Sequence, residues 1–210
     1  KSLIKLFEER SGEIAALGSE VFTYFDPQGD NWGPGWILQV LRRHEPEALE
    51  RLSLGDTSGW YKAPSSVGID YWPLQKELLN ENFEAADHFT SAVLRKLAGT
   101  AAENRGYVYF SEVESMPGID LVSLDRLWIA YSQGRFGFSV QARILKALNG
   151  RYDMLWPRIG WKREGVWTRY PSAFTWRIDA EEGHMPLVNQ LRGVRLMDAI
   201  LNHPSLVNRT

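Results

Sequence analysis

From residue 70 onward the apolar residues recur at intervals of three and four, and this spacing constrains the fold more than any other feature. One set occupies relative positions 0, 3, 4 and 7, which form one face of an α-helix: Leu124, Leu127, Trp128 and Tyr131. No competing run alternates apolar and polar residues with the period of two that a half-buried strand requires. The sequence therefore predicts an all-α protein.

Residues that favour caps and turns mark the ends of the predicted helices. Asn82 is placed to cap one helix and Gly99 to end it. The inward face of that helix is predicted to carry Phe83, Ala86, Thr90, Val93, Leu94 and Leu97. Asp70 is placed to cap the preceding helix, where Pro73 is tolerated in the first turn. Two later helices are predicted around Val140–Leu148 and Tyr152–Ile159.

The connections between helices are predicted from composition. Ala101–Gly106 is small and polar and is predicted to be a loop. Ser111–Glu114 has the pattern of a capping box and is predicted to open a short helix. The turn Gly134–Gly137 is predicted to anchor Phe136 and Phe138 in the core. A last helix is predicted from about Pro186, with Leu187, Leu191 and Val194 facing inward.

A segment rich in Gly, Ser and Pro, from Gly55 to Gly68, is typical of a linker and places a domain boundary near residue 66. Before it, the spacing of Trp36, Ile37, Val40 and Leu41 indicates a helix that ends near Pro46. We therefore expect a small N-terminal helical bundle over residues 1–66 and a larger helical core over residues 67–210.

The later part of the predicted core is rich in aromatic residues, and its segment 151–177 is basic. Fourteen of the 26 aromatic residues lie between Tyr107 and Trp176. Residues 151–177 hold six basic and two acidic residues, so they carry +4 in a chain of net charge −2, and the rest sums to −6. Flat apolar groups beside positive charge suit a ligand that is itself flat, apolar and anionic.

The centre of this region is a long aromatic loop that is interrupted by Gly and Pro, so it is predicted to be a poor helix and a weak strand. Its large rings are Trp161, Trp167, Tyr170, Phe174 and Trp176. Two interpretations stay open. The rings pack on the core and staple the loop to it, or the loop between Gly165 and Gly183 is a binding element that moves as a lid.

Composition excludes several classes of protein. The absence of cysteine excludes disulfides, thiolate metal sites and cysteine nucleophiles, and it fits a cytosol-like compartment. No apolar run approaches the roughly 18 residues of a membrane span. A pI near 6.1 argues against general nucleic-acid binding.

Motifs for catalysis are also missing from the sequence. No two histidines stand four residues apart, and there is no phosphate-binding loop or nucleophile elbow. The acidic residues are predicted to lie on outward helix faces. Asp87 and His88 are interpreted as a surface or half-buried pair, and His184 as part of a solvated loop. We expect a protein that is not an enzyme and has no metal site.

Two segments carry a resemblance to a known family, namely Asp70–Gln75 and the 18-residue string Leu124–Gln141. With Gly106–Glu114, Arg158–Trp161 and Gly183–Pro186, they make residues 67–210 similar to the genomes-uncoupled-four proteins of oxygenic phototrophs, and most similar to the cyanobacterial form.

The resemblance implies a function. Members of this family bind protoporphyrin IX and magnesium protoporphyrin IX and stimulate magnesium chelatase, whose large porphyrin-binding subunit would be the partner. It implies a monomer in the cyanobacterial cytoplasm and leaves peripheral membrane association open. A helical protein-interaction module, whose aromatic loop docks a partner protein, is the alternative from another class.

The resemblance also implies a palm-like binding surface. Mapped on this chain, the palm comprises Ala101–Gly106, Phe110 with Val113, Gly165–Gly183 and Pro186–Val194. The residues expected to contact the porphyrin are Phe110, Val113, Trp167, Tyr170, Phe174, Trp176, Asn189, Arg192 and Leu206. Among these, Asn189 and Arg192 are expected to make the polar contacts. No protein ligand to the magnesium is expected.

Overall fold

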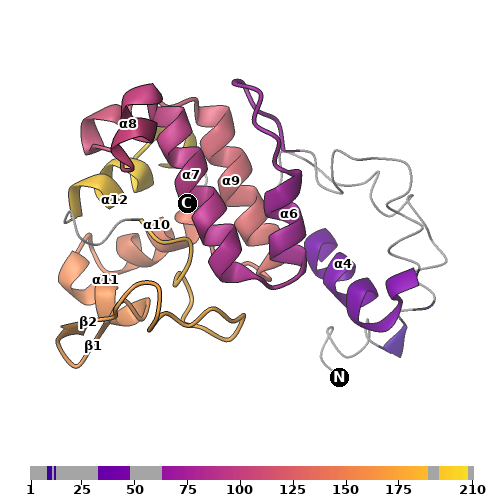
Figure 1. Cartoon of the computed structure of the whole chain (residues 1–210). Helices are drawn as coiled ribbons and strands as arrows, with labels where there is room; N and C mark the ends of the chain where they lie inside the picture. The colour runs from indigo at the N-terminus through magenta and orange to yellow at the C-terminus, as the bar shows by residue number, and fades with distance from the viewer. Residues whose placement is uncertain (1–8, 11, 13–32, 48–62, 189–193, 208–210) are drawn as a thin grey trace.

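The computed structural model describes residues 9–10, 12, 33–47, 63–188 and 194–207. Their regular secondary structure is mostly helical with almost no sheet, which confirms the predicted fold class (Figure 1). The α-helices are α4 (Gly33–His44), α6 (Trp72–Leu79), α7 (Phe83–Ala98), α8 (Thr100–Arg105), α9 (Gly118–Tyr131), α10 (Phe138–Ala147), α11 (Tyr152–Arg158), α12 (Val194–Leu201) and α13 (Pro204–Val207). A 3₁₀ turn, η1 (Phe110–Glu112), and two short strands, β1 (Lys162–Arg163) and β2 (Val166–Trp167), complete them.

Helix α9 is the centre of the core, and helices α4, α6, α10 and α13 pack against it. The four residues predicted to form its inward face are all fully buried, which confirms that prediction. Trp128 stacks on Phe83 of α7 with ring centroids 6.2 Å apart, and its indole Nε1–H donates to Thr90 Oγ1 at 2.9 Å. Asp120 and Asp125 of α9 are also fully buried, so the expectation that acidic residues face outward is wrong for them.

Helix α7 follows its prediction closely. It begins after Asn82 and ends at Gly99, whose φ of 98° is accessible to glycine at little cost. All six residues predicted for its inward face are buried. Its neighbour α6 begins two residues after Asp70, whose carboxylate accepts the Trp72 N–H at 2.9 Å. The predicted turn after α9 is confirmed as well, because Phe136 and Phe138 are fully buried.

Two predicted connections are wrong. Residues 101–106 are not a loop but most of α8, a single short helix between Gly99 and Gly106, which both have positive φ angles. The capping box does not begin at Ser111. Instead, the Tyr109 N–H donates to Glu112 Oε2 at 2.7 Å, so the turn opens two residues earlier and is a 3₁₀ turn.

The last long helix is described from Val194 (α12, Val194–Leu201), and residues 186–188, where the sequence predicts its start, are not helical. Side chains of the core bond the backbone of these residues. Gln141 Nε2 donates to the Pro186 carbonyl at 2.9 Å, and Asp87 Oδ1 accepts the Leu187 N–H at 2.6 Å. Leu187 is buried as predicted, but Val194 is 39 % exposed, and Leu191 lies outside the described residues.

The aromatic loop starts as a β-hairpin that the sequence prediction missed. Lys162 pairs with Trp167 and Arg163 with Val166. The two residues between the strands have positive φ angles, 50° at Glu164 and 82° at Gly165. Such a two-residue turn matches the twist of a hairpin, so a glycine at its second position was the available signal.

The N-terminal helix α4 packs directly on the core. A Cβ atom on Gly35 would lie 2.2 Å from the Ala130 carbonyl oxygen, so only glycine allows this approach. Gln39 Nε2 donates to the Tyr131 carbonyl oxygen at 2.5 Å. The predicted linker is described only from residue 63, and there Ser66 Oγ donates to the buried Asp120 carboxylate at 2.7 Å. The domain boundary near residue 66 stays a prediction.

Candidate functional site

The structure joins most rings of the aromatic loop in one continuous cluster. Trp156 of α11 stacks on Trp161 with centroids 5.7 Å apart and planes 8° apart, and Trp161 contacts Phe174 at 6.4 Å. The other close ring pairs, with their centroid distances, are Trp156–Trp167 (5.4 Å), Tyr170–Phe174 (5.6 Å), Tyr170–Trp176 (5.9 Å) and Phe174–Trp176 (5.5 Å). Four predicted site residues are therefore brought together: Trp167, Tyr170, Phe174 and Trp176.

The exposure of these rings divides them into two groups. Trp161 and Phe174 are buried, at 1 % and 7 % exposed, so they staple the loop to the core. Trp167 is 45 % exposed, and Tyr170 and Trp176 are half-buried. The inner rings thus pack as the staple interpretation predicts, while the outer rings offer apolar surface and the binding interpretation stays a prediction.

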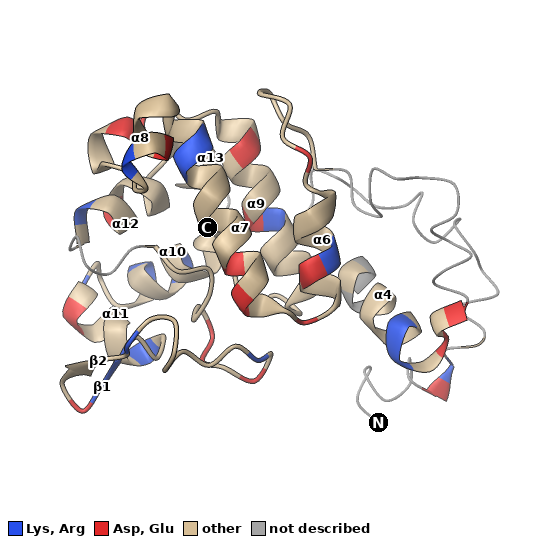
Figure 2. Ribbon diagram, viewed as in Figure 1, with Lys and Arg blue, Asp and Glu red and all other residues tan. Residues whose placement is uncertain are grey.

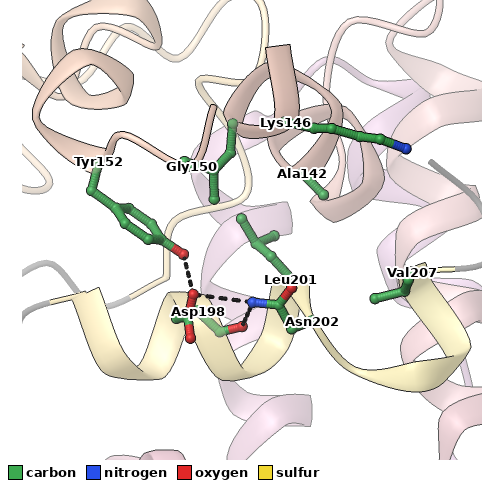
Figure 3. Close-up of a pocket in the computed structure, with 9 residues that line it drawn as sticks. Ala142, Lys146, Gly150, Tyr152, Asp198, Leu201, Asn202 and Val207 are labelled. Atoms are coloured by element: carbon green, nitrogen blue, oxygen red, sulfur yellow. Dashed lines mark hydrogen bonds between the residues drawn. The ribbon is translucent and has the colours of Figure 1, made fainter. Parts of the chain in front are cut away.

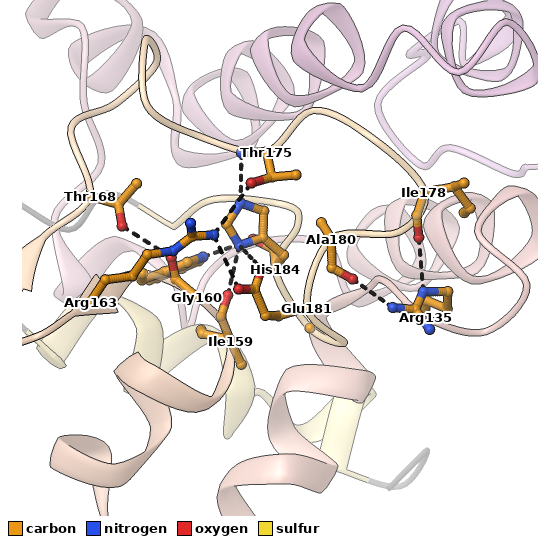
Figure 4. A network of polar contacts seen from close by, with 12 residues as sticks. Arg135, Ile159, Gly160, Arg163, Thr168, Thr175, Ile178, Ala180, Glu181 and His184 are labelled. Atoms are coloured by element: carbon orange, nitrogen blue, oxygen red, sulfur yellow. Dashed lines mark hydrogen bonds and ion pairs between the residues drawn. The ribbon is translucent and has the colours of Figure 1, made fainter.

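The His184 side chain bonds the backbone at Ile159 and at Thr175, at two separate points of the loop (Figure 4). Its ring is fully buried, so the expectation of a solvated loop is wrong. Nδ1 lies 2.7 Å from the Ile159 carbonyl oxygen, and Nε2 accepts the Thr175 N–H at 3.2 Å. This pairing assigns the proton to Nδ1 of a neutral imidazole. Burial lowers the pKa of His184, which keeps the ring neutral.

Other side chains bond the backbone of the same loop. Arg135 donates from Nε to the Ile178 carbonyl at 2.9 Å and from Nη2 to the Ala180 carbonyl at 2.6 Å (Figure 4). Gln141 Nε2 donates to the Gly183 carbonyl at 2.9 Å, and Trp161 Nε1 donates to the His184 carbonyl at 2.8 Å. The loop is therefore anchored along its length, although the lid hypothesis stays a prediction about its motion.

Asp87 is a further residue that the sequence analysis misplaced. It is 0 % exposed rather than half-buried, while His88 beside it is exposed. The Tyr170 hydroxyl donates to Asp87 Oδ2 at 3.1 Å, which links α7 to the aromatic cluster. A polar residue at a position where α7 faces inward was the signal available in the sequence.

The other predicted site residues lie elsewhere in the fold. Phe110 is 46 % exposed, and the Arg195 guanidinium of α12 lies 5.4 Å from its ring centroid. Val113 and Leu206 are buried in the core, at 1 % and 0 % exposed, so they support apolar surface rather than form it in this structure. Asn189 and Arg192 lie outside the described residues.

Three of the six basic side chains in residues 151–177, and Arg143 of α10, form ion pairs with acidic residues that follow the region in the chain. The ion pairs are Arg143–Glu182 (2.9 Å), Arg158–Glu182 (3.7 Å), Arg163–Glu181 (3.1 Å) and Arg177–Asp179 (2.6 Å). All of these side chains except Arg143 line a groove of about 610 Å³ beside the loop. Figure 2 shows the basic positions of β1 beside the end of α11. The predicted +4 of residues 151–177 is thus reduced locally, because that window stops before Asp179.

A second cavity, of about 330 Å³, lies between α10, α11, α12 and α13 (Figure 3). Its lining includes Ala142, Leu145, Lys146, Gly150, Tyr152, Asp198, Leu201, Asn202 and Val207. Its polar wall is formed where Asp198 Oδ1 accepts the Tyr152 hydroxyl at 2.9 Å and the Asn202 amide at 3.0 Å. None of the predicted porphyrin contacts among the described residues lines it.

The described residues lack two classes of site. They contain no group of three or more His, Asp or Glu side chains that could hold a metal ion. Within the same part of the chain, no helix has the length and apolar character needed to cross a bilayer.

Comparison with known proteins places this architecture in a family. The GUN4-like family profile matches residues 64–204. The chain belongs to the GUN4-like family. This confirms the resemblance drawn from the motifs at Asp70–Gln75 and Leu124–Gln141.

Two relatives show how far the similarity extends. The chain is 45 % identical over 171 residues to a Ycf53-like protein of Synechocystis sp., which covers 81 % of this chain and 73 % of that protein. It is 37 % identical over 141 residues to the "Tetrapyrrole-binding protein, chloroplastic" of Arabidopsis thaliana, covering 63 % of this chain and 53 % of that protein.

Two solved structures share the fold. GUN4 from Chlamydomonas reinhardtii superposes with a TM-score of 0.66 at 38 % identity and covers 70 % of this chain and 93 % of that one. Ligand-free Arabidopsis thaliana GUN4 gives a TM-score of 0.61 at 35 % identity, covering 68 % and 98 %.

Proposed function

We propose that this chain binds protoporphyrin IX and magnesium protoporphyrin IX and, without being an enzyme, stimulates magnesium chelatase through that enzyme's large subunit. The observation that carries the porphyrin proposal is the aromatic cluster, whose outer rings Trp167, Tyr170 and Trp176 are held in place by buried inner rings. Membership of the GUN4-like family and the name of the tetrapyrrole-binding relative support the same ligand class.

The physical chemistry of a porphyrin fits such a surface. The macrocycle is a rigid apolar plate with ionised propionates along one edge. Burying roughly 300 Å² of apolar surface at about 25 cal/mol/Å² contributes about 7.5 kcal/mol before ordering costs, so polar contacts to the propionates have to add to it to reach affinity in the micromolar range, about 8 kcal/mol. We propose that the exposed rings supply apolar contacts and that Asn189 and Arg192 bind the propionates.

The proposal is tested first by titrating the full chain with protoporphyrin IX and magnesium protoporphyrin IX. Binding should shift the Soret band and quench tryptophan fluorescence, because Trp167 and Trp176 would lie against the macrocycle. A chain that binds neither porphyrin, yet captures the chelatase large subunit, would favour the alternative of a protein-interaction module. Stimulation of the chelatase is tested separately, by assaying that enzyme with and without the chain.

A variant at Arg192 tests the contact with the propionates. Arg192→Ala should weaken porphyrin binding by about 0.5–3 kcal/mol, depending on how dry the site is. The loss should shrink when the propionates are esterified, because the partner charge is then absent. Arg177→Ala is the matched control, since Arg177 is exposed and already paired with Asp179. Equal losses for charged and esterified macrocycles would assign Arg192 to packing or folding instead.

A further inference from the structure

Asp87 lies in the second turn of α7, in a setting where an acidic residue is costly. Its side chain is 0 % exposed, and its neighbours Phe83, Ala86 and Thr90 on the same helix are buried too. None of the ion pairs between described residues involves Asp87. A carboxylate buried without a cation is destabilising unless hydrogen bonds compensate it, so its partners reveal its role.

Those partners belong to two segments that are far from α7 in the sequence. Asp87 Oδ1 accepts the backbone N–H of Leu187 at 2.6 Å, across 100 residues. Asp87 Oδ2 accepts the hydroxyl of Tyr170 at 3.1 Å, across 83 residues. One carboxyl group therefore joins a core helix, the aromatic loop and the chain that leads from Leu187 toward Asn189.

Each of the two hydrogen bonds of Asp87 restrains more than the residue that makes it. The Tyr170 ring meets Phe174 and Trp176 edge-on, at 5.6 and 5.9 Å, so fixing its hydroxyl fixes this part of the aromatic cluster. The Leu187 bond fixes the backbone two residues before Asn189, one of the proposed polar contacts. The aromatic loop and the chain at Leu187, which carry the two parts of the proposed porphyrin surface, are thus both bonded to the carboxyl group of Asp87.

The surroundings of Asp87 shift its ionisation toward neutral pH. Burial raises the pKa of Asp87 to about 7, although the hydrogen bonds from Leu187 and Tyr170 act in the opposite direction. On the aromatic loop the facing group is the Tyr170 hydroxyl, whose pKa is raised by burial and by the charge of Asp87. The segment of Leu187 and Val188 brings no ionisable side chain. The remaining charged or titratable groups near this pair are Glu84, His88 and Arg95 of α7.

We propose that Asp87 is a positioning residue that holds the aromatic loop and the chain at Leu187 in one arrangement, so that both are released together when its hydrogen bonds are lost. Only the effect on porphyrin affinity rests on the proposed function. The joint release is a property of the protein without ligand.

Hydrogen exchange of the full-length protein without ligand tests the joint release. Asp87→Ala should speed exchange both in residues 168–176 and in residues 184–188, while α9 stays protected. Tyr170→Phe should speed exchange only in the aromatic loop, because the Leu187 bond remains. Asp179→Ala is the control, since Asp179 is an exposed carboxylate of the same loop. Faster exchange in only one segment of Asp87→Ala, or a pattern like that of Asp179→Ala, would overturn the proposal.

Asp87→Asn provides a second test that does not depend on whether Asp87→Ala folds. An amide can accept the Leu187 N–H through Oδ1 and donate to the Tyr170 oxygen through Nδ2, but it cannot ionise. We expect it to keep both segments protected. A porphyrin on the cluster brings ionised propionates toward Asp87, and this negative charge favours the uncharged carboxyl group, so wild-type affinity should fall by about threefold or more between about pH 6 and pH 8.

The same titrations with Asp87→Asn should show a flatter pH dependence than the wild type and the Asp179→Ala control, which correct for the porphyrin's own titration. An identical slope in wild type and Asp87→Asn would overturn the role of ionisation. If no form of the protein binds porphyrin, the proposed function fails, while the exchange experiment still decides whether Asp87 joins the two segments.

Discussion

The two halves of the molecule are held together by different forces. In the helical half, formed by α6, α7 and α9, large apolar side chains such as Trp128 and Phe83 are fully buried against one another. In the loop half, residues 159–188, rings are packed as well, but buried polar side chains fix the backbone. His184, Arg135 and Gln141 each bond main-chain groups of this segment.

This difference predicts which changes destabilise each half. Apolar packing depends on volume and is largely indifferent to pH, so the helical half should be most sensitive to cavities. Hydrogen bonds to a buried imidazole or carboxyl group depend on its protonation state, so the loop half should be sensitive to titration. The proposed binding surface lies in the second half, whose arrangement can change without unfolding the first.

The largest effect is expected for Trp128→Ala in α9. The change removes a fully buried ring and the donor to Thr90 Oγ1. Loss of such a ring costs about 3–5 kcal/mol, which should appear as a lower urea midpoint with a two-state transition. The matched control is Trp167→Ala, because Trp167 is 45 % exposed and lies in the loop half. Similar losses in the two variants would contradict the division between the halves.

Sequence patterns predicted the helical half well and the loop half poorly, for a physical reason. The inward faces of α7 and α9 follow from the helical period, because each position is decided by burial along one element. His184 gains its role from partners 9 and 25 residues away and Asp87 from partners 83 and 100 residues away, so the helical period shows that Asp87 faces inward but not what either side chain bonds. The family resemblance pointed to the aromatic loop, but not to the residues that hold it.

His184→Gln tests whether the stability of the loop half depends on pH. Removing the imidazole weakens the bonds to Ile159 and Thr175 and should cost about 1–3 kcal/mol near neutral pH. Burial lowers the pKa of His184 in the folded state, so its contribution is complete above the ordinary value of 6.5 and is lost as pH falls below it. The stability difference between wild type and variant should therefore shrink from about pH 7 to pH 5.

The direction of this pH dependence distinguishes His184 from Asp87. Because the pKa of Asp87 is raised, its contribution to stability is lost at high rather than at low pH. The folded state keeps a proton on Asp87 that the unfolded chain releases above 3.8, so this contribution is complete below 3.8 and is lost as pH rises through about 7. His88→Gln serves as the control because His88 is exposed. A difference that stays constant with pH would show that His184 acts by packing alone.

Gly35→Ala tests whether α4 belongs to the helical half. Alanine favours a helix by up to about 1 kcal/mol over glycine, but its Cβ would lie 2.2 Å from the Ala130 carbonyl oxygen. Because a backbone atom cannot move aside cheaply, overpacking should dominate and leave a net loss of about 1–2 kcal/mol in urea unfolding. Porphyrin affinity should not change, in the variant or in a chain of residues 67–210, if the proposed surface lies wholly in the core.

The smallest effect is expected for Arg163→Ala at the surface of the loop half. The Arg163–Glu181 pair is 3.1 Å long, but the two side chains are 57 % and 37 % exposed, so water and salt screen it. We expect a loss below about 1 kcal/mol that shrinks further at high ionic strength. His184 also lies 3.9 Å from Glu181 through Nδ1, so Arg163→Ala leaves that carboxylate beside the imidazole without its cation. A loss as large as that of His184→Gln, or one unaffected by salt, would mean that surface ion pairs rather than buried polar groups hold the loop half in place.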